Sequence, residues 1–500
     1  MKRLPGVCAA LGIGFVAFAL DPARDILLSW PEPNPSVVDL AHEIGAAAVL
    51  VPFNPGSTYD RFASACSQAG ILPVAELRQE GSVATLRERA RLALKAGFGG
   101  LAYQATGNEA ELRRFIEDHA NVPQLVFVDP SRANWRLEPA YAVWTQALWP
   151  GTKRPEPTSA SATESPWIDA NLWLISWLRA RFPERPPILG QRPDPEAGVA
   201  EDQYVPNSTV EVALAEARIA GGNWILALPE RYRQALIEGE LQAIRDWRSL
   251  ARSIQFLREH LGDLQASAGL RILALAGELE ETGEILNLLF RHNATPAVEH
   301  VASPRLSMLL ASGGYSVVVA ANLEPPEPLR APLLEFAKRG GTLVVAPSAS
   351  ERAPWWSTAA QPGKSEAGTH GPLRLGQGRL IVYPEPIVDV HEFALDVIAA
   401  LNWKVRDLRI WGAPTILGLV RRSTQGGLTL GLIDYGHRWT QDHDPDFLIQ
   451  VYGRFAKAEL LVPERSASIP LSPRVRGELT EIELRDLRYV GLIQMQRGEE

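Results

Sequence analysis

The chain has 500 residues, of which 46% are hydrophobic. This length is more than one hydrophobic core usually accommodates, so we expect two or three domains. Its formal net charge is -8, from 50 basic and 58 acidic residues that are interspersed along the chain. This charge pattern builds no basic face, which argues against nucleic acid or an anionic membrane as the main partner. The 14 tryptophans stand out, because indole rings suit sugar stacking as well as core packing.

Residues 1–19 have the pattern of a secretory signal peptide. Lys2 and Arg3 precede an apolar run, and Ala17-Phe18-Ala19 offers a small-x-small cleavage site. Cleavage there predicts a periplasmic or secreted protein with no membrane span after signal removal. The alternative is that the segment GIGFVAFAL forms a buried first strand.

The chain has two cysteines, Cys8 and Cys66. Cys8 would leave with the signal peptide, so neither an intrachain disulfide nor a thiolate metal site is expected. Cys66 lies in the helical pattern DRFASACSQAG, on the face that should point inward. We therefore predict a packing role for Cys66.

Between residues 20 and 265, strand and helix patterns alternate in the number that a (β/α)₈ TIM barrel requires. The clearest unit is Phe98–Phe115, a buried strand that ends at Gln104, followed by a polar turn and an amphipathic helix. The expected helices include the Trp-rich segment Trp167–Phe182 and one long closing helix from Arg231 through Leu261. The expected strands are Ile26–Trp30, Ala48–Phe53, Ile71–Leu77, Phe98–Gln104, Gln124–Asp129, Tyr141–Gln146, Ile188–Gln191 and Asn223–Leu228.

Two further domains are predicted after the barrel. Residues 266–405 repeat short β-branched strands separated by helices, beginning with LRILALAG, which predicts a doubly wound, flavodoxin-like α/β domain with a parallel sheet. Residues 406–500 change to hairpins, with Gln425-Gly426-Gly427 between two alternating apolar runs. This last segment predicts a small antiparallel β-sandwich.

The order of barrel, α/β domain and small sandwich resembles the β-galactosidase-like glycoside hydrolases, in which a glutamine-amidotransferase-like domain follows the catalytic barrel. In the second domain the likeness rests on LRILALAG and APLLEFAKRGGTLVVAPS. The resemblance implies a carbohydrate ligand at the C-terminal mouth of the barrel, no cofactor, and a second domain that serves packing or homo-oligomer contacts. Amidotransferase activity is not expected, because it needs a nucleophilic Cys and none follows Cys66.

The resemblance also implies a general acid after the fourth strand, usually as Asn-Glu, and a nucleophilic Glu at the end of the seventh. These two strands end in Gln104 and Gln191, and an amide can neither protonate a leaving group nor form a glycosyl ester. Asn108-Glu109 does follow the fourth strand. With Glu111 three residues after Asn108, the pattern favours a helix capping box over a catalytic Glu109.

Glu76 and Asp129 are the predicted substitute for the missing catalytic pair, because they end the strands that flank the fourth strand. Two such carboxyls must lie about 5–5.5 Å apart for retention, or about 6.5–9.5 Å apart for inversion of configuration. The alternatives are an ion pair for Glu76, an Asx-type turn for Asp129 and a cap of the last helix for Glu230. The predicted substrate-binding residues are Trp30, Glu32, Gln104, Trp144, Gln191 and Glu230, with Trp149 at the same rim.

Two interpretations of function therefore stay open. The first is an exported glycoside hydrolase-like enzyme. The second is a carbohydrate-binding or assembly protein that keeps the fold without hydrolysis. The one cluster with metal-ligand content is His437 and His443 with Asp442 and Asp444, and its place in a hairpin loop favours a solvated turn over a metal site.

Overall fold

The computed structural model describes residues 20–498, except 23, 78–82, 130–131, 133, 154–166, 191, 196–197, 206, 262–270, 350, 352–353, 358–372, 401–405, 423–426, 439–445 and 486. The predicted signal segment lies outside these ranges, so export stays a prediction. Within them, no helix combines the length and the apolar composition needed to cross a bilayer.

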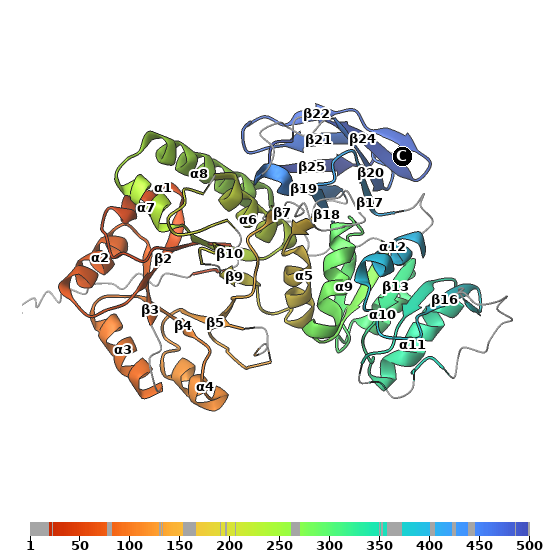
Figure 1. Ribbon diagram of the computed structural model, residues 1–500, viewed down its shortest axis with the longest axis horizontal. Coiled ribbons are helices and arrows are strands. Elements are labelled where there is room, and N and C mark those ends of the chain that lie inside the picture. The colour runs from red at the N-terminus through yellow and green to blue at the C-terminus, as the bar shows by residue number, and fades with distance from the viewer. Residues whose placement is uncertain are drawn as a thin grey trace, which may run out of the picture.

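Eight parallel strands close into a barrel, which confirms the first predicted architecture (Figure 1). Around the barrel the strands follow the order β1-β10-β9-β6-β5-β4-β3-β2. One buried cluster contains apolar side chains from all eight strands, such as Leu27, Val74 and Ile225. The strands are β1 (Ile26–Ser29), β2 (Ala46–Pro52), β3 (Leu72–Leu77), β4 (Gly100–Gln104), β5 (Gln124–Val128), β6 (Tyr141–Trp144), β9 (Ile188–Gly190) and β10 (Asn223–Ala227).

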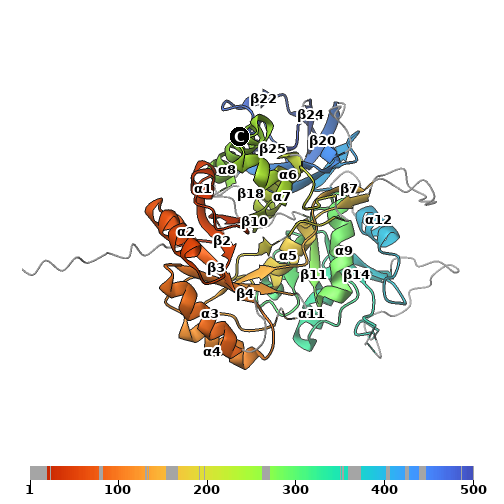
Figure 2. The same ribbon diagram turned by 60° about the vertical axis from the view of Figure 1, so that its left-hand side comes forward.

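Amphipathic helices cover the outside of the barrel, as the apolar spacing predicts. Figure 2 shows α2, α3 and α4 along the outer side of β2, β3 and β4. Cys66 is fully buried on the inner face of α2, which confirms its packing role. The helices are α1 (Val37–Glu43), α2 (Ser57–Gln68), α3 (Val83–Lys95), α4 (Glu109–Asp118), α5 (Leu172–Arg181), α6 (Asn207–Ala220), α7 (Glu230–Ile237) and α8 (Leu241–Leu261).

Three expectations about the barrel helices are wrong. The single closing helix is divided into α7 and α8, because the chain turns at Gly239, which has a φ of 73°. The Trp-rich helix begins only at Leu172, since Trp167–Asp169 forms β8, which pairs with β7 (Gly151–Lys153). Between β5 and β6 the described residues form no α-helix, and α7 and α8 both follow β10, so the helices do not alternate one to one with the strands as expected.

A six-stranded sheet of order β12-β11-β13-β14-β16-β15 follows the barrel. The first five strands are parallel as predicted, and β15 runs antiparallel to β16. Helices α9 and α12 pack on one face, and α10 and α11 on the other. The elements are β11 (Ile272–Ala276), α9 (Leu279–Arg291), β12 (Ala297–His300), α10 (Leu306–Ala311), β13 (Val317–Ala320), α11 (Glu327–Lys338), β14 (Thr342–Val345), β15 (Leu373–Leu375), β16 (Gly378–Val382) and α12 (Val390–Ala400).

Two antiparallel sheets, β17-β20-β24-β23 and β18-β19-β25-β21-β22, end the chain. Both sheets contribute to one apolar cluster, for example Ile449 and Ile482 from one and Leu430 and Ile493 from the other. The predicted hairpin is confirmed by the pairing of β18 with β19. The strands are β17 (Leu408–Trp411), β18 (Ile416–Arg422), β19 (Leu428–Asp434), β20 (Phe447–Tyr452), β21 (Lys457–Leu461), β22 (Ile469–Leu471), β23 (Arg474–Arg476), β24 (Leu479–Leu484) and β25 (Val490–Gln496); a 3-10 turn, η3 (Tyr435–Arg438), follows β19.

Helices α5 and α6 join the barrel to the later sheets. Helix α5 lies against α9 (Figure 1). Trp177 Nε1 of α5 donates a 3.0 Å hydrogen bond to the carbonyl of Gly277, just before α9. Helix α6 contacts β19 and η3, and the Tyr435 hydroxyl donates to Glu216 over 2.9 Å. The tryptophans of α5 thus fill an interface between the barrel and the six-stranded sheet as well as a core.

Candidate functional site

A cavity of about 530 Å³ opens at the carboxyl ends of the barrel strands. Its volume is in the range of ordinary small-ligand sites, and this end of a barrel is where its enzymes place their chemistry. The lining combines carboxylates, arginines and two aromatic side chains with the backbone at the strand ends. The lining residues are Ser29, Pro31, Pro52, Glu76, Leu77, Tyr103, Gln104, Phe127, Arg192, Pro193, Glu201, Ala227, Leu228, Glu230 and Arg233.

Glu76 lies at the end of β3 and forms a 2.7 Å ion pair with Arg192, which follows β9. In the order of the barrel, β3 and β9 are opposite one another, so this ion pair spans the mouth. The Glu76 side chain is 14% exposed and that of Arg192 is 75% exposed. Trp149 Nε1 donates to the carbonyl of Arg192 over 2.9 Å and thereby fixes the backbone of the arginine, while its guanidinium reaches into solvent.

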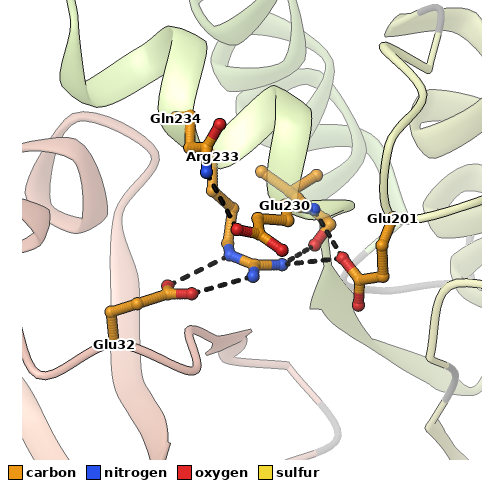
Figure 3. Close-up of polar contacts among 6 residues, drawn as sticks. Glu32, Glu201, Glu230, Arg233 and Gln234 are labelled. Atoms are coloured by element: carbon orange, nitrogen blue, oxygen red, sulfur yellow. Dashed lines mark hydrogen bonds and ion pairs between the residues drawn. The ribbon is translucent and has the colours of Figure 1, made fainter.

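A second group of polar residues is centred on Arg233 of α7 (Figure 3). Its guanidinium binds both oxygens of Glu32 at 2.9 and 3.2 Å, lies 3.5 Å from a Glu201 oxygen and donates to the carbonyl of Leu228. The Arg233 side chain is only 6% exposed, whereas the side chains of Glu32 and Glu201 are about half exposed. The arginine therefore ties the loop after β1, the loop after β9 and the end of β10 together beside the cavity.

Glu230 begins α7, and its backbone N–H donates to Glu201 over 2.5 Å. Its own carboxylate accepts a 2.9 Å hydrogen bond from Gln234 one turn later in the helix (Figure 3). A carboxylate in the first turn also interacts favourably with the positive end of the helix dipole. Glu230, Glu201 and Glu76 thus line one cavity.

The side of the cavity at β4 and β5 is less charged. Gln104, which ends β4, lines the cavity, and so does the preceding residue, Tyr103. The Tyr103 hydroxyl donates a 2.6 Å hydrogen bond to Gln124. Burial raises the pKa of Tyr103 well above its ordinary value, so its phenol is a neutral donor. Phe127 fits beside β9 because Gly190 has no side chain; a Cβ there would lie 3.1 Å from the Phe127 ring.

The predicted tryptophan platform is wrong. Trp30 and Trp144 are 1% and 2% exposed, Trp149 is 2% exposed, and none of the three lines the cavity. Trp144 stacks on Phe182 instead, with ring centroids 5.6 Å apart. An indole whose faces are covered by protein cannot stack on a sugar, so the described structure gives Trp30 and Trp144 a packing role.

The structure places some of the other predicted residues at the mouth and others away from it. Glu32 and Glu230 lie at the mouth with Glu76 and Gln104, whereas Asp129 does not line the cavity and accepts a 2.7 Å hydrogen bond from Gln146. Gln191 lies outside the described residues.

The predicted N-cap at Asn108 is confirmed at the start of α4, whereas the Glu111 half of the capping box stays a prediction. The side chain of Asn108 accepts a 2.8 Å hydrogen bond from Ala110 N. Glu109 accepts one from Arg136 N over 2.9 Å and does not line the cavity. This residue is therefore part of a local structural contact away from the mouth.

Sequence reasoning missed Arg192, Glu201 and Arg233. Arg192 directly follows the predicted seventh strand, so its position at a strand end was a usable signal. Glu201 lies in an irregular loop, and Arg233 has the sequence context of a solvated helix residue, so neither was marked by a local pattern. Within the described ranges no three His, Cys, Asp or Glu side chains are grouped to hold a metal. The His437 and His443 cluster falls outside the described side chains.

No protein-family model matches the sequence, and no curated protein sequence matches it. Among solved structures, the α-L-fucosidase isoenzyme 2 from Paenibacillus thiaminolyticus aligns with 96% of this chain and 100% of its own, at a TM-score of 0.60 and 7% identity. A rhamnosidase from Novosphingobium sp. PP1Y covers 88% of this chain and 40% of its own, at a TM-score of 0.45 and 14% identity. The exo-β-1,4-mannosidase Op5Man5 from Opitutaceae bacterium strain TAV5 covers 72% and 91%, at a TM-score of 0.46 and 12% identity.

The likeness to the fucosidase extends over the whole chain, but at 7% identity it concerns the fold alone. The other two TM-scores are too low to support an argument. These three structural neighbours are named as a fucosidase, a rhamnosidase and a mannosidase, which are glycoside hydrolases.

Proposed function

We propose that this protein binds a glycan in the cavity at the barrel mouth and hydrolyses a glycosidic bond there. The observation on which the proposal depends is that Glu76, Glu201 and Glu230 line one cavity of about 530 Å³ at the carboxyl ends of the strands. Glycoside hydrolysis needs two carboxyl groups on either side of the scissile bond. The whole-chain fold likeness to a protein named as an α-L-fucosidase supports the same class of ligand.

Glu76 is the proposed anionic carboxylate of the reaction. It is bound by the guanidinium of Arg192, and an anionic carboxylate can act as nucleophile or base but cannot donate a proton. The proton donor would be a second carboxyl group. Asp129 remains our sequence-based candidate; Glu230 lines the same cavity as Glu76, but its place in the first turn of α7 stabilises the anion rather than the proton-donating form.

A glycan-binding protein without hydrolytic activity is the second candidate. Gln104 favours it, because an amide lines the cavity at the strand end where the resemblance would place the general acid. The side chain of Glu109, which follows in sequence, is bound to the backbone of Arg136 instead. A sugar hydroxyl can bind to Gln104, but no proton for a leaving group can come from it.

The two candidates are separated by a screen of aryl glycosides together with a binding assay on a glycan array. If hydrolysis is found, Glu76→Gln and either Glu230→Gln or Asp129→Asn should each lower the rate by about 10² to 10⁴. Glu109→Gln is the matched control and should keep the parental rate. Full activity in Glu76→Gln would refute the catalytic assignment, and binding without any cleavage would establish the second candidate.

Three further proposals concern the rest of the chain. Export with cleavage near residue 20 is supported by the charged leader and Ala17-Phe18-Ala19; N-terminal sequencing of protein from its host tests it, and an intact Met1 would refute it. The sheet β11–β16 would be an amidotransferase-like domain that serves packing or homo-oligomer contacts. The two C-terminal sheets would form the predicted sandwich. Light scattering of the chain and of a variant truncated after Gly262 tests the contact role.

A further inference from the structure

A second polar cavity lies where the six-stranded sheet meets the two C-terminal sheets, and all its lining residues follow the barrel in sequence. It has a volume of about 260 Å³ and lies beside a wider groove of about 780 Å³, with which it shares the lining residues Tyr452, Gly453, Phe455 and Arg497. Arg271 precedes β11, Arg422 ends β18, and Tyr452 ends β20. We call this cavity with its groove the arginine pocket.

Four arginines line the arginine pocket: Arg271, Arg422 and Arg497 in the cavity, and Arg454 in the groove. Among the described lining residues the one carboxylate is Glu478, which accepts a 3.1 Å hydrogen bond from the Tyr452 hydroxyl. No ion pair joins any of the four guanidinium groups to a carboxylate of the described residues. Such a gathering of cations is unfavourable by itself, and it is notable in a chain whose net charge is -8.

Arg271 packs against the ring of Tyr452. Its guanidinium lies 4.6 Å from the centre of the Tyr452 ring, and its Nη1 lies 3.3 Å from the Tyr452 hydroxyl. Its backbone N–H donates to Asp407 over 2.8 Å. Its Nε is buried and has no hydrogen-bond partner among the described residues. A buried donor without a partner beside an open cavity points to a missing acceptor.

We propose that the arginine pocket binds an oxyanion, either the carboxylate or sulfate group of an acidic glycan or a free phosphate. Guanidinium groups bind carboxylate and phosphate through pairs of parallel N–H donors, and they keep their charge at all physiological pH values. The cavity accommodates the anionic group between Arg271, Arg422 and Arg497. The groove beside it has room for the rest of a larger ligand. This site does not depend on hydrolysis at the barrel mouth.

Isothermal titration calorimetry on the full chain tests the proposal with three ligands at constant ionic strength: sodium phosphate, oligogalacturonate and its neutral methyl ester. Saturable binding of phosphate or oligogalacturonate is expected, and the methyl ester should bind at least 10-fold more weakly than the acid. Oligogalacturonate binding more tightly than phosphate would identify an acidic glycan as the source of the anion, and the reverse order would identify free phosphate.

The double variant Arg422→Ala/Arg497→Ala should weaken anion binding at least 10-fold, because both side chains are exposed and can be removed without opening a core. Arg485→Ala is the matched control, since Arg485 is an exposed arginine that pairs with Asp446 outside the pocket. Equal melting curves of the three proteins would show that the fold is kept. The proposal is overturned if the parent binds neither anion, if the double variant binds as the parent does, or if Arg485→Ala causes the same loss.

Discussion

Glu216 provides the sharpest test of the structure, because a buried carboxylate on α6 joins the barrel to the C-terminal sheets. It is fully buried and accepts hydrogen bonds from Asn171 N, from Asn171 Nδ2 at 2.8 Å and from the Tyr435 hydroxyl at 2.9 Å. Burial raises the pKa of Glu216 from 4.5 to about 7, although these donors act in the opposite direction. The native protein therefore holds a proton on Glu216 that the unfolded chain releases at lower pH.

A raised carboxyl pKa makes the protein less stable as the pH rises. Between pH 4.5 and about 7 the folded state binds more protons than the unfolded state, so the stabilising contribution of the protonated Glu216 is present below pH 4.5 and is lost as the pH rises through 7. At 1.36 kcal/mol per pKa unit, the contribution of Glu216 to the free energy of unfolding is about 3 kcal/mol smaller above pH 7 than below pH 4.5. Tyr435→Phe removes one donor to this group and should make the loss larger.

The expected cost of Tyr435→Phe depends on the charge of its partner. At pH 8.5 the lost hydrogen bond is to an ionised carboxylate, so the free energy of unfolding should fall by about 1.5–3 kcal/mol. At pH 5.5 the partner is protonated, and the loss should be about 0.5–1.5 kcal/mol. Glu211, whose pKa burial also raises to about 7, titrates in parent and variant alike and cancels in the difference.

Urea unfolding followed by tryptophan fluorescence at both pH values measures these differences. Tyr103→Phe is the matched control, because the Tyr103 hydroxyl is buried and donates to the amide of Gln124, which does not titrate. Its loss should be the same at pH 5.5 and 8.5. An equal loss at both pH values for Tyr435→Phe, or a larger loss at pH 5.5, would refute the assignment of a titrating Glu216 at this interface.

Three other predictions concern the barrel. Gly190→Ala should destabilise the fold by about 1–3 kcal/mol in thermal or urea unfolding, because the new Cβ would lie 2.7 Å from Val143; an unchanged midpoint would contradict this packing of the strand end. Arg233→Met should lower the free energy of unfolding by about 1–3 kcal/mol and weaken any glycan binding at the mouth, since the loops beside the cavity lose their shared donor. Calorimetry with the ligand from the screen measures the affinity, and an unchanged affinity would count against this role of Arg233. Cys66 should react with a thiol reagent only after unfolding, because burial raises the pKa of its thiol to about 12, and rapid labelling of the native protein would show that α2 opens.

Much of the fold was predictable because its signals are local. The alternation of short apolar runs with helical spacing is a property of neighbouring residues, and it located all eight barrel strands. The cap at Asn108 and the hairpin between β18 and β19 follow from the preferences of a few adjacent residues. Gly239, which follows the end of α7, was also a local signal, although one continuous helix was expected there.

The sequence by itself therefore determined the barrel, the order of the sheets and the presence of acidic residues at the strand ends. Only the tertiary structure decided which of these residues share the mouth. Glu76 and Arg192 are 116 positions apart in the chain, and they meet because closure of the barrel places the ends of opposite strands around one mouth. Arg233 is buried and Trp30 and Trp144 are covered because other elements pack over them, and the exposure of a side chain depends on neighbours that are distant in sequence.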